Sequence, residues 1–124
     1  MVLVYSTGPL ENDLPNPSER VAARALNNGV EKVTVLWLAF ALDGAKRLVD
    51  SARVTLGPQE SALVVLRLNG AAQFEVEAQV EGLAAQETLV SAFGLDGEGR
   101  ASPVHRVLHA EMTLLADPDP IDEA

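Results

Sequence analysis

The chain has 124 residues, which suits one domain and is too short for two. Its net charge of −9 argues against nucleic-acid binding, because phosphate contacts need clustered Lys and Arg, and the nine basic residues here are scattered. Cysteine is absent, which excludes disulfides, thiolate metal sites and thiol redox chemistry.

The chain opens with a short apolar, β-prone piece, residues 2–6, followed by a segment rich in proline. Residues 7–18 contain Pro9, Pro15 and Pro17, which disfavour helix and predict an extended connector. We therefore expect three parts: an N-terminal strand with its connector (1–18), a β-sandwich domain (19–116) and an acidic C-terminal tail (117–124).

Beyond the connector, apolar and polar side chains alternate with a period of two, and turn residues interrupt the pattern at regular intervals. The clearest case is 74–81, where the apolar residues fall on one face and Glu or Gln on the other. Residues 33–42 are apolar on both faces, as expected of a central strand covered on each side. The predicted strands are 20–27, 33–42, 48–56, 62–68, 74–81, 88–95 and 104–115.

This spacing of strands predicts the fold class. Seven short strands in one domain are typical of an all-β, Ig-like or fibronectin-like antiparallel β-sandwich. A jelly roll needs eight strands and remains the near alternative if residues 2–6 join the fold. Residues 83–87 have a helix-forming composition but are long enough for only one turn. We expect a sandwich of seven or eight strands.

Few residues have the setting that catalysis or metal binding needs. His105 and His109 lie four residues apart in one predicted strand, roughly 13 Å from each other, which is too far for one metal ion. Asp96 and Glu98 lie in a Gly-rich turn, but two carboxylates are fewer than a calcium site requires. No P-loop, dinucleotide fingerprint or nucleophile elbow is present. The sequence therefore predicts no catalytic, cofactor-binding or metal-ligating residue, and we expect that the protein is not an enzyme.

The N-terminal strand is the feature of the sequence that bears most directly on function. An exposed apolar strand invites pairing, so Val2, Leu3, Val4 and Tyr5 must be buried somewhere. One alternative is an edge strand within the same subunit. The other is insertion into a neighbouring subunit, as in donor-strand complementation, which propagates into a filament unless it closes into a ring.

A resemblance to a known group lies in segments 89–100 (LVSAFGLDGEGR) and 105–111 (HRVLHAE), together with 25–29 and 33–35. Over roughly residues 20–115 the chain resembles small Ig-like sandwich proteins of spore-forming bacteria. The resemblance implies a sandwich fold and, for some such proteins, a subunit of a surface fibre or spore appendage joined through an N-terminal connector. This chain lacks the cysteines that can crosslink such fibres.

From these features we expect a structural, self-associating β-sandwich, with a subunit of an extracellular or spore-surface fibre as its specific form. The alternative is an accessory module that binds carbohydrate or protein through loops at one end of the sandwich, residues 43–47 and 96–103. Copies of the same chain are the expected partner, without nucleic acid, membrane insertion or a small-molecule ligand. The first residues lack the features of a signal peptide, so we expect synthesis in the cytoplasm, with deposition on the cell or spore surface left open.

Overall fold

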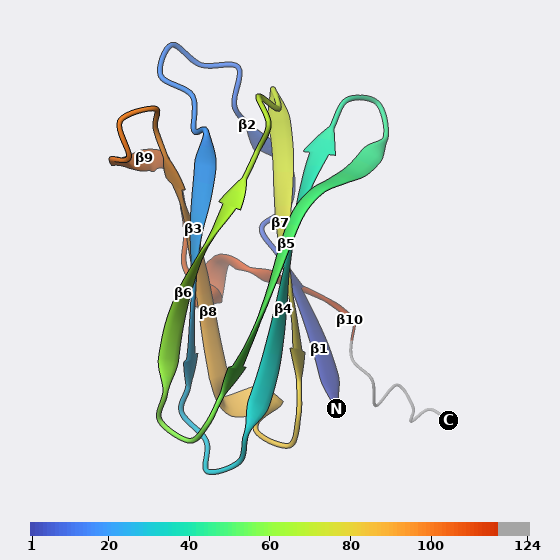
Figure 1. The fold of residues 1–124 in the computed structure, drawn as a ribbon. Helices are drawn as coiled ribbons and strands as arrows, with labels where there is room; N and C mark the ends of the chain where they lie inside the picture. The colour runs from blue at the N-terminus through green and yellow to red at the C-terminus, as the bar shows by residue number, and fades with distance from the viewer. Residues whose placement is uncertain (117–124) are drawn as a thin grey trace.

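Two antiparallel β-sheets account for most of the chain in a computed structural model, which describes residues 1–116 (Figure 1). In sheet A the strand order is β10-β1-β7-β4-β5, with β2 beside β7. Its strands are β1 (Val2–Ser6), β2 (Leu10–Glu11), β4 (Val33–Leu42), β5 (Lys46–Leu56), β7 (Gln73–Glu81) and β10 (Thr113–Ala116).

Sheet B has four strands in the order β6-β3-β8-β9. They are β3 (Arg20–Asn27), β6 (Ser61–Arg67), β8 (Thr88–Leu95) and β9 (Ala101–Val107). The helical elements in the described part of the chain are two 3-10 turns, η1 (Ala85–Glu87) and η2 (His109–Glu111). The expected all-β sandwich is confirmed.

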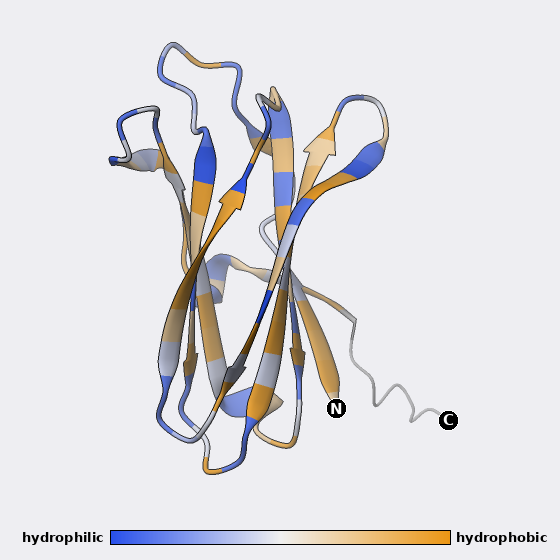
Figure 2. Ribbon diagram, viewed as in Figure 1, coloured by the Kyte–Doolittle hydropathy of each residue, from blue (hydrophilic) through white to orange (hydrophobic). Residues whose placement is uncertain are grey.

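The core lies between the two sheets, where the inward-facing side chains of sheet A meet those of sheet B. Trp37, Phe74, Leu66 and Val80 are almost completely buried there. Figure 2 shows the orange and blue segments alternating along several strands, as expected when one face of a strand is buried and the other meets water. Burial of these apolar side chains is the main driving force for the fold.

Strand β4 departs from the expectation that both of its faces are covered. Its inward residues, from Val33 to Ala41, are buried, whereas the alternate residues from Thr34 to Leu42 are only half-buried. A continuous apolar run is compatible with either arrangement, so the sequence alone does not distinguish them.

The N-terminal strand pairs on both sides within its own subunit, so it is an interior strand of sheet A. β1 is antiparallel to β7 along its whole length and to β10 from Val4 to Ser6. Leu3 points into the core and is 4% exposed.

The proline-rich segment also lies against the sandwich, where we expected a separate connector. β2 pairs with β7, and the buried Asn12 side chain bonds the main chain of Ser18 and the carbonyl of Ala71. Proline is compatible with this path of the backbone, although it lacks a main-chain N–H. An extended segment at a sheet edge uses few main-chain N–H groups as hydrogen-bond donors.

The prediction of one long strand over residues 104–115 is wrong. β9 ends at Val107, η2 follows, and β10 joins the other sheet beside β1. The η2 turn is closed by Glu111, whose Oε1 accepts the main-chain N–H of Leu108. The acidic tail, residues 117–124, lies outside the described residues.

Candidate functional site: the outer face of sheet B

The outward residues of sheet B form a regular surface across all four strands. Because side chains alternate, the buried Val21, Ala23 and Ala25 leave the even-numbered residues of β3 on the outside. The register places Val65, Ala22, Phe93 and Arg106 opposite one another, in a row that crosses the sheet from β6 to β9.

This face is largely apolar, although it is exposed. Five of its large apolar side chains are between 42% and 65% exposed. They are Leu63 and Val65 on β6, Leu89 on β8, Val104 on β9 and Leu108 just after β9. A cluster of this kind marks an interaction surface more often than isolated apolar residues do.

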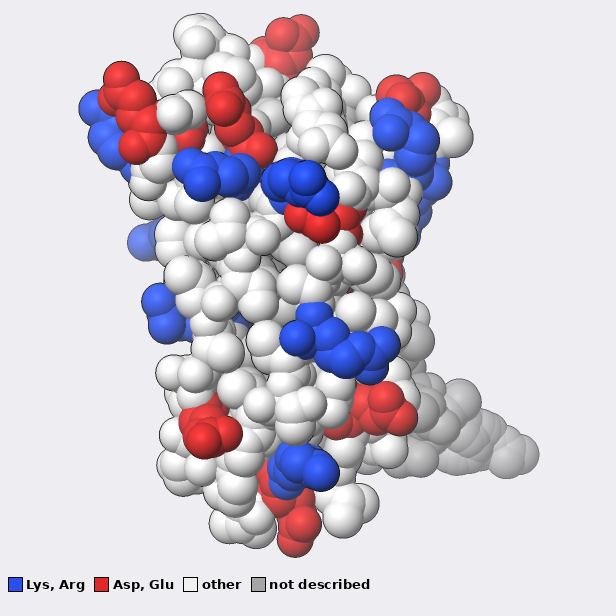
Figure 3. Space-filling model, in the orientation of Figure 1, with Lys and Arg blue, Asp and Glu red and all other residues white. Residues whose placement is uncertain are grey.

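The charge of the face is opposite to that of the whole chain. The four strands of sheet B contain four arginines and no Asp or Glu. Arg67 pairs with Asp50 of β5 at 3.4 Å, whereas Arg20, Arg24 and Arg106 form no ion pair with any described residue. Figure 3 shows blue side chains without red neighbours at mid-height on the left flank, over β3 and β6.

Two hollows open along the outside of β8. The larger, about 450 Å³, lies between β8 and β9 and is lined mainly by apolar groups, including Phe93, Pro103 and Leu108, with Arg106 among them. The smaller, about 220 Å³, is lined by Leu26, Leu89 and Arg24. Ser91 lines both, so they form one feature, which we call the β8 groove. The register between β8 and β9 is irregular from Phe93 to Leu95, and this irregularity adjoins the larger hollow.

His109 lines the smaller hollow and is held in one orientation. Its Nδ1 accepts the main-chain N–H of Val90 at 3.1 Å, and its ring lies 4.9 Å from that of Tyr5. Burial lowers the pKa of His109 and raises the pKa of Tyr5. The neutral form of His109 is therefore favoured, which suits its role as an acceptor.

A hollow of about 570 Å³ lies at one end of the sandwich, between the N-terminal segment and the β6–β7 turn. Asp13, Glu19 and Arg67 contribute its charged groups. The loops expected to form a second site, residues 43–47 and 96–103, do not line it; Asp43 and Arg47 line a smaller hollow of about 190 Å³. The β4–β5 and β8–β9 turns lie at the same end of the molecule (Figure 1).

Asp96 closes the β8–β9 turn. Its Oδ1 accepts the main-chain N–H groups of Glu98 and Arg100, and its Oδ2 accepts from Asn16 and from the Arg100 guanidinium. These bonds, with the Arg100 N–H contributing most, lower the pKa of Asp96 to about 2. The carboxylate oxygens are thus occupied by the turn, in agreement with the interpretation of Asp96 and Glu98 as turn residues.

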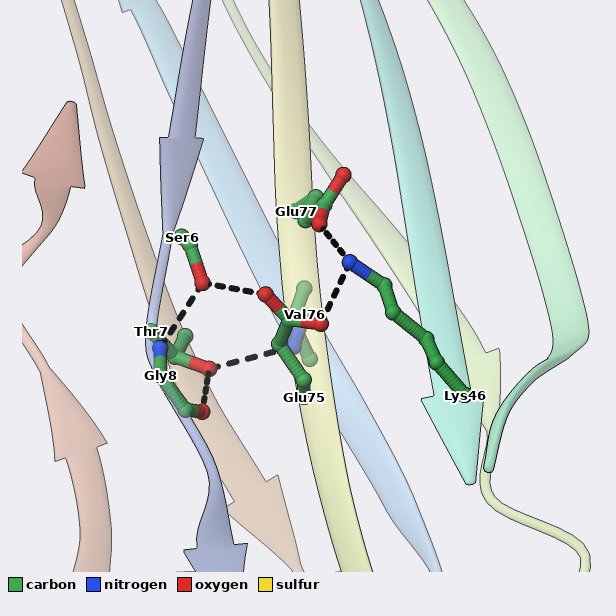
Figure 4. A network of polar contacts seen from close by, with 7 residues as sticks. All are labelled: Ser6, Thr7, Gly8, Lys46, Glu75, Val76 and Glu77. Atoms are coloured by element: carbon green, nitrogen blue, oxygen red, sulfur yellow. Dashed lines mark hydrogen bonds and ion pairs between the residues drawn. The ribbon is translucent and has the colours of Figure 1, made fainter. Parts of the chain in front are cut away.

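A polar network lies on the outer face of sheet A (Figure 4). Lys46 reaches two neighbouring carboxylates on β7, Glu75 at 2.9 Å and Glu77, while its ammonium lies 4.4 Å from the centre of the Phe40 ring. Ser6 of β1 donates to the second oxygen of Glu75. The network therefore ties β1, β7 and β5 together across the sheet.

The four residues proposed for self-association are all placed within the subunit. Leu3 and Tyr5 pack against the core, whereas Val2 and Val4 are half-buried beside Glu81 and Gln79 of β7. None of the four lines the β8 groove, although the Tyr5 ring contacts His109, which lines its smaller hollow. His105 and His109 are also separated, because β9 ends between them.

Within residues 1–116, no three His, Asp or Glu side chains are grouped as metal binding requires. The same residues include no helix long and apolar enough to cross a bilayer.

Comparison with known proteins adds a distant structural likeness. No family model matches the chain, and no curated protein matches it. The crystal structure of Thermotoga maritima 1070 is similar at 14% sequence identity and a TM-score of 0.45, over 91% of this chain and 90% of that one.

Proposed function

We propose that this protein is a structural, self-associating β-sandwich whose subunits meet through the outer face of sheet B. The observation that supports this most is the exposed apolar face carrying arginines but no carboxylate. The strands of sheet B account for four of the nine basic residues, so the rest of the chain has 18 acidic and five basic residues. The remaining surface of a second copy therefore complements this face in charge.

Such a contact would join two different surfaces of the same protein. Heterologous contacts of this kind form rings when the rotation closes and filaments when it does not. The fibre that we expected from the sequence is one outcome of this geometry. Assembly by exchange of β1 is a less direct route, because β1 would first have to separate from both β7 and β10.

Sedimentation velocity from micromolar to millimolar concentration tests the proposal. The full-length protein is expected to associate as its concentration rises, and Leu63→Glu is expected to shift it toward the monomer. Leu48→Glu is the matched control, because Leu48 is similarly exposed but lies on β5 of sheet A. A monomer at every concentration, or equal effects of the two substitutions, would overturn the proposal.

A second candidate function is an accessory binding module that uses the loop end. The hollow of about 570 Å³ between the N-terminal segment and the β6–β7 turn, with Asp13, Glu19 and Arg67 in its lining, favours it. No aromatic side chain lines this hollow, so a sugar ring would lack the stacking platform common in carbohydrate sites. A glycan array with the wild type and with Arg67→Ala tests this alternative, and binding that depends on Arg67 would support it.

A further inference from the structure

The β8 groove has the chemistry of a site for an extended acidic segment. Its lining is largely apolar, with Phe93, Leu89 and Leu108 contributing, and one arginine lines each hollow, Arg106 in the larger and Arg24 in the smaller. Neither guanidinium has a carboxylate partner among residues 1–116. A complementary ligand would carry several carboxylates and at least one apolar side chain.

The chain itself contains a segment with this composition. Residues 117–124 carry four carboxylates, those of Asp117, Asp119, Asp122 and Glu123, with Ile121 among them and no basic residue. Asp117 and Asp119 each precede a proline, and residues before proline favour extended backbone. Eight extended residues span roughly 26 Å, and the outside of β8 from Leu89 to Leu95 is about 20 Å long. The segment and the groove therefore match in charge and composition, and eight extended residues are enough to run along β8.

A second copy of the chain is the better source of this segment than the same subunit. β10 ends at Ala116 in sheet A, whereas the groove lies on the outer face of sheet B. In Figure 1, β10 runs away from β3 and β6 toward the opposite side of the sandwich. Within one subunit the segment would have to reverse its direction and pass around the edge of the sandwich to reach the groove.

We propose that residues 117–124 of one copy bind in the β8 groove of a second copy, with their carboxylates toward Arg24 and Arg106 and Ile121 in an apolar hollow. This inference rests on the proposed self-association and names the two surfaces that meet. Each subunit then has one groove and one segment, so the contact is heterologous and propagates from copy to copy.

A labelled synthetic peptide of residues 117–124, titrated with the full-length protein and followed by fluorescence anisotropy, tests the contact. Saturable binding that weakens with added salt is expected. The double variant Arg24→Glu/Arg106→Glu should lose binding by at least about tenfold, because two attractive charges become repulsive. The matched control, Lys32→Glu/Arg53→Glu, makes the same change of charge away from the groove and should bind like the wild type. A peptide with its carboxylates replaced by amides should bind weakly.

Absence of peptide binding, or equal loss in both double variants, would overturn the inference. Sedimentation of the same proteins separates this failure from failure of the proposed function. If the wild type associates but the peptide does not bind, the segment is not the occupant and self-association still stands. If the peptide binds but the wild type remains a monomer, both the second-copy contact and the proposed function fail. Binding to phosphatidylserine vesicles that depends on Arg24 and Arg106, without peptide binding, would assign the groove to a membrane surface and also overturn the inference.

Discussion

The Ser18 hydroxyl lies 2.7 Å from Nδ1 of His105 and joins the segment before β3 to strand β9 across 87 positions of the chain. The other ring nitrogen, Nε2, lies 2.6 Å from the carbonyl oxygen of Glu11. A carbonyl can only accept, so Nε2 carries a proton and donates to Glu11, while Nδ1 shares a second hydrogen bond with the Ser18 hydroxyl. His105 is buried and its ring meets Phe74 edge-on at 5.1 Å. This histidine therefore fastens the proline-rich segment to the sandwich.

Removing the Ser18 hydroxyl should weaken this attachment. Ser18→Ala leaves a buried nitrogen of His105 without a hydrogen-bond partner, so we expect the free energy of unfolding to fall by about 1–3 kcal/mol. Urea denaturation followed by the fluorescence of Trp37, the single tryptophan, measures the change. Ser51→Ala is the control, because Ser51 is an exposed serine on β5. Equal stabilities of the two variants would show that the Ser18–His105 contact does not stabilise the fold.

The fold was predictable from the sequence to the extent that its signals are local. Alternation identified the strands because each residue of a strand meets the same face as its second neighbour. The pairing of β1 was not predictable, because an apolar strand buried in its own sheet has the same sequence as one buried in a neighbour. The outer face of sheet B was also missed, since Arg20, Arg24, Arg67 and Arg106 come together only through the strand order β6-β3-β8-β9. The sequence did contain a signal for this face, because none of those four strands contains an acidic residue.

Truncation of the Leu3 side chain should show how much β1 contributes to the stability of the subunit. Leu3 is 4% exposed and packs in the core, so Leu3→Ala should lower the free energy of unfolding by about 2–5 kcal/mol. Val2→Ala is the control from the same strand, where the side chain is half-buried and the loss should be smaller. Urea denaturation measures both. Equal, small effects would indicate that β1 is not docked in its own subunit in solution.

The Asp96 turn should give the protein a specific sensitivity to acid. The pKa of Asp96 lies at about 2 in the folded protein, below its ordinary value of 3.8. A carboxylate with a lowered pKa stabilises the fold above its unfolded pKa, and this stabilisation is lost as the pH falls toward the folded value. The wild type should therefore be more stable than Asp96→Asn at pH 7, and the difference should shrink between about pH 4 and pH 2. Urea midpoints measured across this range test the prediction, with Asp13→Asn expected to follow the wild-type profile. A difference that stays constant with pH would contradict it.

Lys46 should be needed for the stability of the fold, because it lies between two buried carboxylates. Glu75 and Glu77 are neighbours on the same face of β7, and their side chains are only 11% and 8% exposed. Burial acts to raise the pKa of Glu75, but hydrogen bonds from Ser6 and Lys46, with the Lys46 charge, outweigh it and lower the pKa. The bond to Glu77, followed by the bond to Glu75, raises the pKa of Lys46. Lys46→Met removes the compensating charge and leaves two buried carboxylates side by side.

We expect Lys46→Met to lower the free energy of unfolding by about 1–3 kcal/mol at pH 7, less than for a fully buried pair because water reaches the ammonium. The loss should decrease as the pH falls below 4.5, the ordinary pKa of a glutamate, since protonation of Glu75 removes the repulsion in the variant and the stabilising charge contact in the wild type. Lys46→Arg keeps the charge and should recover part of the stability. Lys32→Met removes an exposed lysine elsewhere and should have little effect. Urea denaturation of the four proteins at pH 7 and pH 3 tests the prediction, and equal losses for Lys46→Met and Lys32→Met would show that the network does not stabilise sheet A.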